Sequence, residues 1–122
     1  MIIVHHLNNS RSQRILWLLE ELGLAYEIKK YQRDPKTMLA PPELRAVHPL
    51  GKSPVIQDGD TIVAESGAII EYLVDTYDRE QQLKPAPGSQ AARDYTYWLH
   101  YAEGSAMPPL LLKLLFTLMP KR

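Results

Sequence analysis

The stretch His48-Pro49-Leu50-Gly51-Lys52-Ser53-Pro54-Val55-Ile56, together with Glu65-Ser66-Gly67 further along, decides the fold of this chain. Its proline- and glycine-rich part predicts a loop, and its last two residues predict a short apolar strand. Asp58-Gly59 is a two-residue hairpin signal, and a second apolar pair, Ile62-Val63, follows it. Glu65-Ser66-Gly67 then predicts the start of a helix. A loop, a strand, a tight turn, a strand and a helix are therefore expected in succession.

This unit offers two features to a peptide-like ligand. The extended backbone just before Pro54 can pair with another extended chain, as in strand addition. The helix N-terminus near Ser66 can hold a carboxylate, because its first N–H groups have no partner and carry a partial positive charge.

The residues before this unit predict a strand, a helix and a second strand. Residues 2–7 are largely apolar and β-branched, as in a buried strand. Ser10 and Gln13 match the capping box, so a helix is expected to begin at Ser10 and to end before Gly23. Residues 26–31 predict the next strand. Such a unit implies a parallel pair with a right-handed crossover.

Two further helices are expected in the first 78 residues. Pro41-Pro42-Glu43 suits a helix start, and Pro49 must close that helix by residue 47 or 48. Residues 65–77 form the second helix, because apolar side chains recur along it at helical spacing.

The last third of the chain predicts a second domain. Residues 79–88 are polar and rich in proline, so they indicate a linker between residues 1–78 and residues 89–122. A helix is expected from Gln90 through Ala106, and Pro108-Pro109 is expected to kink or restart it. The run 110–116 is apolar almost all round and should be buried. Because no later segment covers it, we expect a truncated domain that associates with a second copy.

Composition narrows the choice of partners. The 14 basic and 14 acidic side chains cancel, which does not favour nucleic-acid binding. The chain has no cysteine, which excludes disulfides, thiolate metal sites and a dithiol redox centre on it. We expect a cytoplasmic protein without a membrane partner, because the longest apolar run is about half of the ~20 residues that a membrane span needs. His5 and His6 face opposite ways on a strand and cannot share a metal, so no metal site is expected.

Four motifs in this order resemble the N-terminal domain of a glutathione S-transferase, of the bacterial and fungal group that begins Asn-Ser-Arg-Ser. They are Asn9-Ser10-Arg11-Ser12, Ala40-Pro41-Pro42-Glu43-Leu44, His48-Pro49-Leu50-Gly51-Lys52-Ser53-Pro54 and Ala64-Glu65-Ser66-Gly67. The resemblance covers residues 1 to about 80 densely, and residues from 89 onward are similar to the first helices of that family's second domain. It implies an α/β, thioredoxin-like βαβαββα domain followed by the beginning of an all-α domain.

The resemblance also implies how glutathione binds. Pro54 would follow a cis bond, and the backbone of Ser53 would pair with the cysteinyl unit. Glu65 and Ser66 would hold the γ-glutamyl end, and Lys52 would contact a carboxylate or the glutathione backbone. Each residue has a plainer role as well: Glu65 and Ser66 as a helix cap, Lys52 as a solvated charge and Pro54 as a strand-start proline.

Ser10 would donate its hydroxyl to the glutathione sulfur, although serine at this place is also a typical helix cap. A free thiol has a pKa of about 8.5, and lowering it by ~2 units requires ~2.7 kcal/mol. One hydrogen bond to a charged group supplies ~1.5–3 kcal/mol. Asn9 and Ser12 compete for the same task, Arg11 would assist the local field, and His48 is a weaker candidate contact for the glycine end.

The function that the resemblance implies is a cytoplasmic, homodimeric transferase of the detoxification type. It would activate the glutathione thiol for attack on a small apolar electrophile, with glutathione as co-substrate and no metal. The alternative is a glutathione- or partner-binding module without significant turnover. A thioredoxin-like redox enzyme is nearly excluded, because Ser10-Arg11-Ser12-Gln13 stands where a dithiol would be required.

Overall fold

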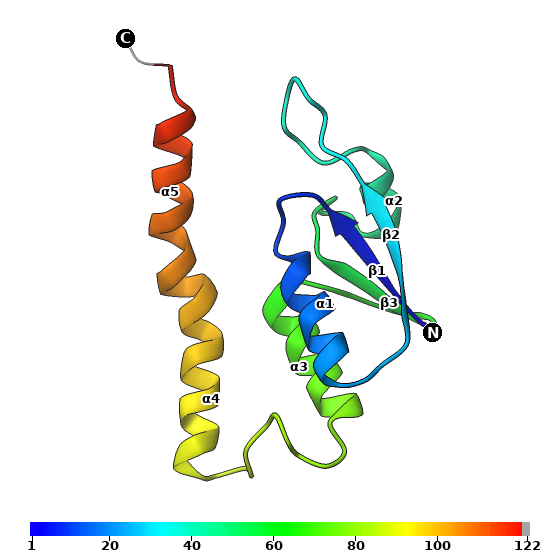
Figure 1. Cartoon of the computed structure of the whole chain (residues 1–122), viewed down its shortest axis with the longest axis vertical. Coiled ribbons are helices and arrows are strands. Elements are labelled where there is room, and N and C mark those ends of the chain that lie inside the picture. Colours follow the sequence, from blue (N-terminus) through cyan, green and yellow to red (C-terminus); the bar gives the residue numbers. More distant parts are fainter. Residues whose placement is uncertain (121–122) are drawn as a thin grey trace. The chain divides into compact units, whose positions relative to one another are not determined.

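A computed structural model describes residues 1–120 of the chain, which form two compact units, one of residues 1–79 and one that begins at residue 80 (Figure 1). The first unit contains a four-stranded sheet in the order β2-β1-β3-β4. Strand β1 pairs parallel with β2 and antiparallel with β3, and β3 pairs antiparallel with β4. The elements of this unit are β1 (Ile2–Leu7), α1 (Ser12–Glu21), β2 (Tyr26–Tyr31), α2 (Glu43–Val47), β3 (Val55–Asp58), β4 (Thr61–Ala64) and α3 (Ser66–Tyr77).

The predicted βαβαββα order and the parallel β1–β2 pair are confirmed. Helices α1 and α3 lie on the same side of the sheet (Figure 1). Their apolar faces and the alternate side chains of the strands form the main core, because successive strand residues point to opposite faces. The fully or nearly buried members of this core are Ile2, Val4, Ile15, Leu19, Ile56, Ile69 and Leu73.

Two predicted boundaries are wrong by one or two residues. The hairpin turn consists of Gly59 and Asp60 rather than Asp58 and Gly59, because Asp58 pairs with Thr61. Gly59 has φ +59°, which only glycine adopts without strain, so the glycine rather than the aspartate takes the first turn position. Helix α1 begins at Ser12 and not at Ser10. No side chain caps its first turn.

A hydrogen-bonded cluster joins the hairpin to α3. The hydroxyls of Tyr72 and Tyr77 both donate to Oδ2 of Asp58, at 2.9 and 2.5 Å. This carboxylate raises the pKa of Tyr77 to about 12, chiefly because its hydrogen bond favours the protonated phenol. The cluster holds the C-terminal half of α3 against the end of β3.

The opposite face of the sheet carries a smaller core under α2, formed by Leu7, Tyr31 and Leu44. His5 lies beside it and is only 3% exposed. Its Nδ1 lies 2.9 Å from the Tyr31 hydroxyl, while its Nε2 has no partner among the residues that the structure describes. Burial, with a smaller contribution from the charge of Lys29, lowers the pKa of His5 below its ordinary value of 6.5.

The buried His5 imidazole predicts acid sensitivity. The folded protein holds His5 neutral, whereas the unfolded chain takes up a proton near pH 6.5. The free energy of unfolding should therefore decrease as the pH falls below this value, by at most ~1.4 kcal/mol per pH unit for one proton. Urea unfolding of wild-type protein, His5→Asn and His100→Gln at several pH values between about 7 and 5 measures this slope. The free energy of unfolding of His5→Asn should be lower than that of the wild type, and it should change less with pH. His100 is exposed, and its variant should keep the wild-type slope.

The second unit consists of α4 (Gln90–Tyr101), the π-helical segment η1 (Ala102–Ala106) and α5 (Met107–Leu118). Ser89 caps α4 by accepting the Ala92 N–H at 3.0 Å. Pro108 and Pro109 fall in the first turn of α5, where proline is tolerated. The helix is irregular just before them, at the π-helical segment η1.

The predicted burial of residues 110–116 is wrong for this chain. Leu110 is 58% exposed and Phe116 is 69% exposed. A single helix cannot bury an apolar surface that surrounds it, and the second unit has no further described element that covers these side chains. None of the helices in residues 1–120 is long and apolar enough to cross a membrane.

Candidate functional site

The Ser53–Pro54 peptide bond at the start of β3 is cis, as the resemblance implies. The Ser53 side chain is fixed against the end of β1 by two hydrogen bonds. Its hydroxyl donates to the carbonyl oxygen of His5 at 2.8 Å and accepts the N–H of Leu7 at 3.2 Å. The loop before β3 therefore has a defined position relative to the first strand.

Ser10 lies next to Ser53, with 3.3 Å between the two Oγ atoms. Two motifs that are 43 residues apart in the chain are thus brought together. The turn before α1 makes this contact, and Asn9 adopts φ +52° in that turn, a left-handed conformation that asparagine tolerates. Ser10 Oγ also accepts the N–H of Ser12 at 3.3 Å, so Ser10 stabilises this turn instead of capping the helix.

Ser12 does not compete with Ser10 for a ligand, because its side chain is fully buried. Its Oγ lies 2.7 Å from Ser10 Oγ on one side and 2.7 Å from His6 Nδ1 on the other. Sequence reasoning missed His6, which it considered only as a metal ligand. The spacing of six residues between His6 and Ser12 carries no recognisable signal, because the contact depends on the turn at Asn9.

Glu65 and Ser66 lie at the junction of β4 and α3. Val55 pairs with Ala64, so Glu65 follows directly on the residue that pairs with the neighbour of Pro54. Glu65 has φ +75° and ψ 125°, a strained conformation for a residue other than glycine that costs of order 1–3 kcal/mol and is typical of functional sites.

The N-terminus of α3 offers free donors. Ser66 is the first helical residue and is 4% exposed. The first helical hydrogen bond runs from the N–H of Ile69 to the carbonyl of Glu65, at 2.9 Å. The N–H groups of residues 66–68 are therefore outside the helical ladder, in the position where helices bind anions.

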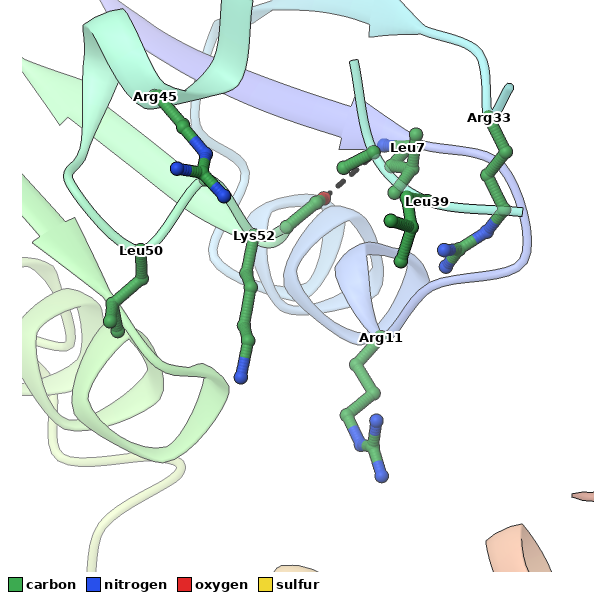
Figure 2. A pocket seen from close by; sticks show the side chains of 10 residues that line it. Leu7, Arg11, Arg33, Leu39, Arg45, Leu50 and Lys52 are labelled. Carbon is green, nitrogen blue, oxygen red and sulfur yellow. Dashed lines mark hydrogen bonds between the residues drawn. The ribbon is translucent and has the colours of Figure 1, made fainter. Parts of the chain in front are cut away.

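A cavity of about 460 Å³ opens beside Ser53, between the end of β1 and the loops around α2 (Figure 2). It brings together Arg11, Lys52 and Ser53 of the predicted residues, whereas Ser10, Pro54, Glu65, Ser66 and His48 are not among its lining residues. His48 Nδ1 instead accepts the Leu50 N–H at 3.3 Å within the loop. The full lining is Leu7, Arg11, Arg33, Leu39, Ala40, Arg45, Leu50, Gly51, Lys52 and Ser53.

The cavity wall is basic. Four cationic side chains and no acidic ones line it, so it suits an anion. Arg33 is committed to the fold, because its guanidinium donates to three carbonyl oxygens, those of Asn8, Asn9 and Met38, at 3.0–3.1 Å. Arg45 projects from α2 and Lys52 from the loop that leads to β3 (Figure 2). No group of His, Asp and Glu side chains among residues 1–120 could hold a metal ion.

Residues 10–76 match the family profile described as glutathione S-transferase, N-terminal domain, which covers more than half of the chain. The chain belongs to the glutathione S-transferase family. It is 42% identical over 123 residues to glutathione S-transferase 1 of Saccharomyces cerevisiae, and this alignment covers 96% of the chain and 52% of the relative. The chain thus spans about half the length of the curated relatives that it matches.

Solved glutathione S-transferase structures have the same fold. A glutathione S-transferase from Actinobacillus pleuropneumoniae superposes with a TM-score of 0.87 at 48% identity, covering 100% of this chain and 56% of the other. A glutathione transferase from Phanerochaete chrysosporium, solved with oxidised glutathione, superposes with a TM-score of 0.77 at 28% identity, covering 99% of this chain and 55% of the other. Both therefore share the fold of the glutathione S-transferase domain described here.

Proposed function

We propose that this chain binds glutathione and activates its thiol for attack on a small apolar electrophile, as a glutathione transferase does. The observation that carries the proposal is the contact between Ser10 and Ser53, 3.3 Å apart, at the cis bond that opens β3. The Ser10 hydroxyl thereby lies beside the extended backbone at Ser53. The family membership and the glutathione-bound relative support the same conclusion.

The charges of the site complement those of glutathione, which has two carboxylates and one ammonium group. The γ-glutamyl carboxylate would accept hydrogen bonds from the N-terminus of α3 at Ser66, and the Glu65 carboxylate would lie near the ammonium. The glycine carboxylate would bind Lys52, with Arg45 close by in the same basic cavity. The cysteinyl unit between these ends would pair with the backbone of Ser53.

The reaction requires a thiolate. On binding, the thiol proton would pass to solvent, and the Ser10 hydroxyl would stabilise the remaining negative charge by donating a hydrogen bond. The sulfur electron pair then forms a bond to carbon. In a substitution, the leaving group departs with the electron pair of the bond that breaks. Ser10 keeps its proton throughout and is not a nucleophile.

The remaining assignments belong to the same proposal. Residues 1–78 would bind glutathione, residues 79–88 would link the units, and residues 89–122 would begin the helical domain that faces the electrophile. The exposed apolar side chains of α5 favour association, and we propose a cytoplasmic homodimer that acts in detoxification.

Replacing Lys52 by alanine should weaken glutathione binding about tenfold, because a hydrogen bond to a charged group is worth ~1.5–3 kcal/mol and Arg45 compensates in part. Titration calorimetry with glutathione measures this effect. Lys113→Ala is the matched control, since Lys113 lies on exposed α5, and it should bind like the wild type.

Two outcomes would change the conclusion. If wild-type protein shows no heat of binding at millimolar glutathione, the proposed function is wrong. If it binds glutathione but leaves the thiol pKa unchanged and turns over no test electrophile, the chain is a glutathione-binding module and not a transferase.

A further inference from the structure

A short chain of hydrogen bonds runs behind Ser10, and the reaction described above does not use it. His6 Nδ1 lies 2.7 Å from Ser12 Oγ, and Ser12 Oγ lies 2.7 Å from Ser10 Oγ. Ser12 is fully buried, so water does not compete for its hydroxyl. These hydrogen bonds therefore connect the imidazole ring of His6, on β1, to the hydroxyl that would face the glutathione sulfur.

The number of protons limits how these hydrogen bonds can be arranged, because each serine hydroxyl has only one proton to donate. Ser53 donates its proton to the His5 carbonyl, at 2.8 Å, so only the Ser10 proton is available for the 3.3 Å contact between Ser10 and Ser53. Ser10 Oγ already accepts the backbone N–H of Ser12. The direction in which Ser12 and Ser10 donate is thus left to His6, because its Nδ1 either carries a proton and donates or is bare and accepts, whereas each serine Oγ can do both at once.

The two arrangements have opposite consequences for a thiolate. If Nδ1 is bare, Ser12 must donate to it, and Ser10 must then donate to Ser12. The sulfur would meet only the lone pairs of Ser10, which repel a negative charge. If Nδ1 carries a proton, His6 donates to Ser12 and Ser12 donates to Ser10. Ser10 then keeps its own proton, which points to Ser53 without a ligand and which the sulfur would accept in place of Ser53.

We propose that His6 is a positioning residue, which by carrying a proton on Nδ1 directs Ser12 and Ser10 so that Ser10 donates to the glutathione sulfur. This inference rests on the proposed function. Successive hydrogen bonds in one direction also polarise one another, which strengthens the last donor. No bond is made or broken in this role, and His6 neither gains nor loses a proton during turnover.

His6→Phe removes the donor while keeping a flat ring. We expect the pKa of the bound glutathione thiol, followed by thiolate absorbance, to rise by about 0.5–1 unit. At a pH about one unit below the thiol pKa, the conjugation rate should fall about three- to tenfold, because the thiolate population there falls by the same factor as the acid dissociation constant of the thiol. The glutathione dissociation constant should stay within about twofold, because His6 does not touch the ligand.

Two further variants are controls for His6→Phe. His6→Asn retains an N–H donor and should keep most of the wild-type rate. His100→Phe on α4 is the matched control.

A double-mutant cycle tests the path. In a Ser12→Ala background the link is absent, so His6→Phe should have no further effect on the thiol pKa. An equal effect in both backgrounds, or no effect in the wild-type background, overturns the role of His6 while leaving Ser10 intact. If the wild type binds no glutathione, or if Ser10→Ala does not raise the thiol pKa, the proposed function fails and the role of His6 fails with it.

Nitrogen NMR of the His6 ring in wild-type protein with bound glutathione is a readout that needs no variant. The proposal requires a proton on Nδ1. A ring protonated on Nε2 alone overturns it, whatever the variants do.

Discussion

Ser10→Ala is expected to lower the rate of glutathione conjugation about 10- to 150-fold, because the lost hydrogen bond to a thiolate is worth ~1.5–3 kcal/mol. The pKa of the bound thiol should return toward the ~8.5 of a free thiol, so the deficit should shrink as the pH is raised. The neighbouring Ser12 hydroxyl cannot replace it, since it is fully buried behind Ser10. Conjugation rates measured from neutral to alkaline pH check this prediction.

Two controls separate chemistry from folding. Ser10→Thr keeps a hydroxyl at the same place and should retain a large part of the rate. Ser105→Ala, on the exposed face of η1, should not alter the rate. If Ser10→Ala conjugates at the wild-type rate with an unchanged thiol pKa, Ser10 serves only the turn before α1.

Leu73→Ala is expected to reduce the free energy of unfolding by about 2–5 kcal/mol, a large share of the ~5–15 kcal/mol that keeps a domain folded. Leu73 is fully buried and packs in the core between α3 and the sheet. Its truncation leaves a cavity that neighbouring side chains fill only in part. Urea unfolding gives the change directly.

The matched control for this variant is Leu118→Ala, which removes the same atoms from a side chain that is 71% exposed. Its effect should stay below ~0.5 kcal/mol. Similar losses in both variants would mean that α5 is as firmly packed as α3. Leu73→Ala should also weaken glutathione binding at temperatures where it begins to unfold, because α3 carries Ser66 at its N-terminus.

Local rules predicted most of the first unit because they act over a few residues. A β-branched apolar run predicted β1, helical spacing predicted α3, and Pro49 predicted the end of α2. The same rules misplaced the hairpin turn by one residue. Asp58-Gly59 and Gly59-Asp60 are both acceptable turns, and the pairing of Asp58 with Thr61 decides between them.

The candidate site was only partly accessible to sequence reasoning. Ser10, Ser53 and Ser66 came from motifs, and the structure brings the first two within 3.3 Å. The backbone strain at Glu65 and the basic wall that Arg45 shares with Lys52 had no sequence signal, because both depend on how loops meet.

By itself, the sequence determined the order of strands and helices, the family and the residue types available to meet a glutathione thiol, because periodicity, turns and motifs are properties of neighbouring residues. Only the tertiary structure decided that Ser12 is buried behind Ser10, that His6 reaches it at 2.7 Å and that the leucines of α5 remain exposed. These facts depend on which surfaces pack together across the chain, and packing is settled by the whole fold and not by any local stretch.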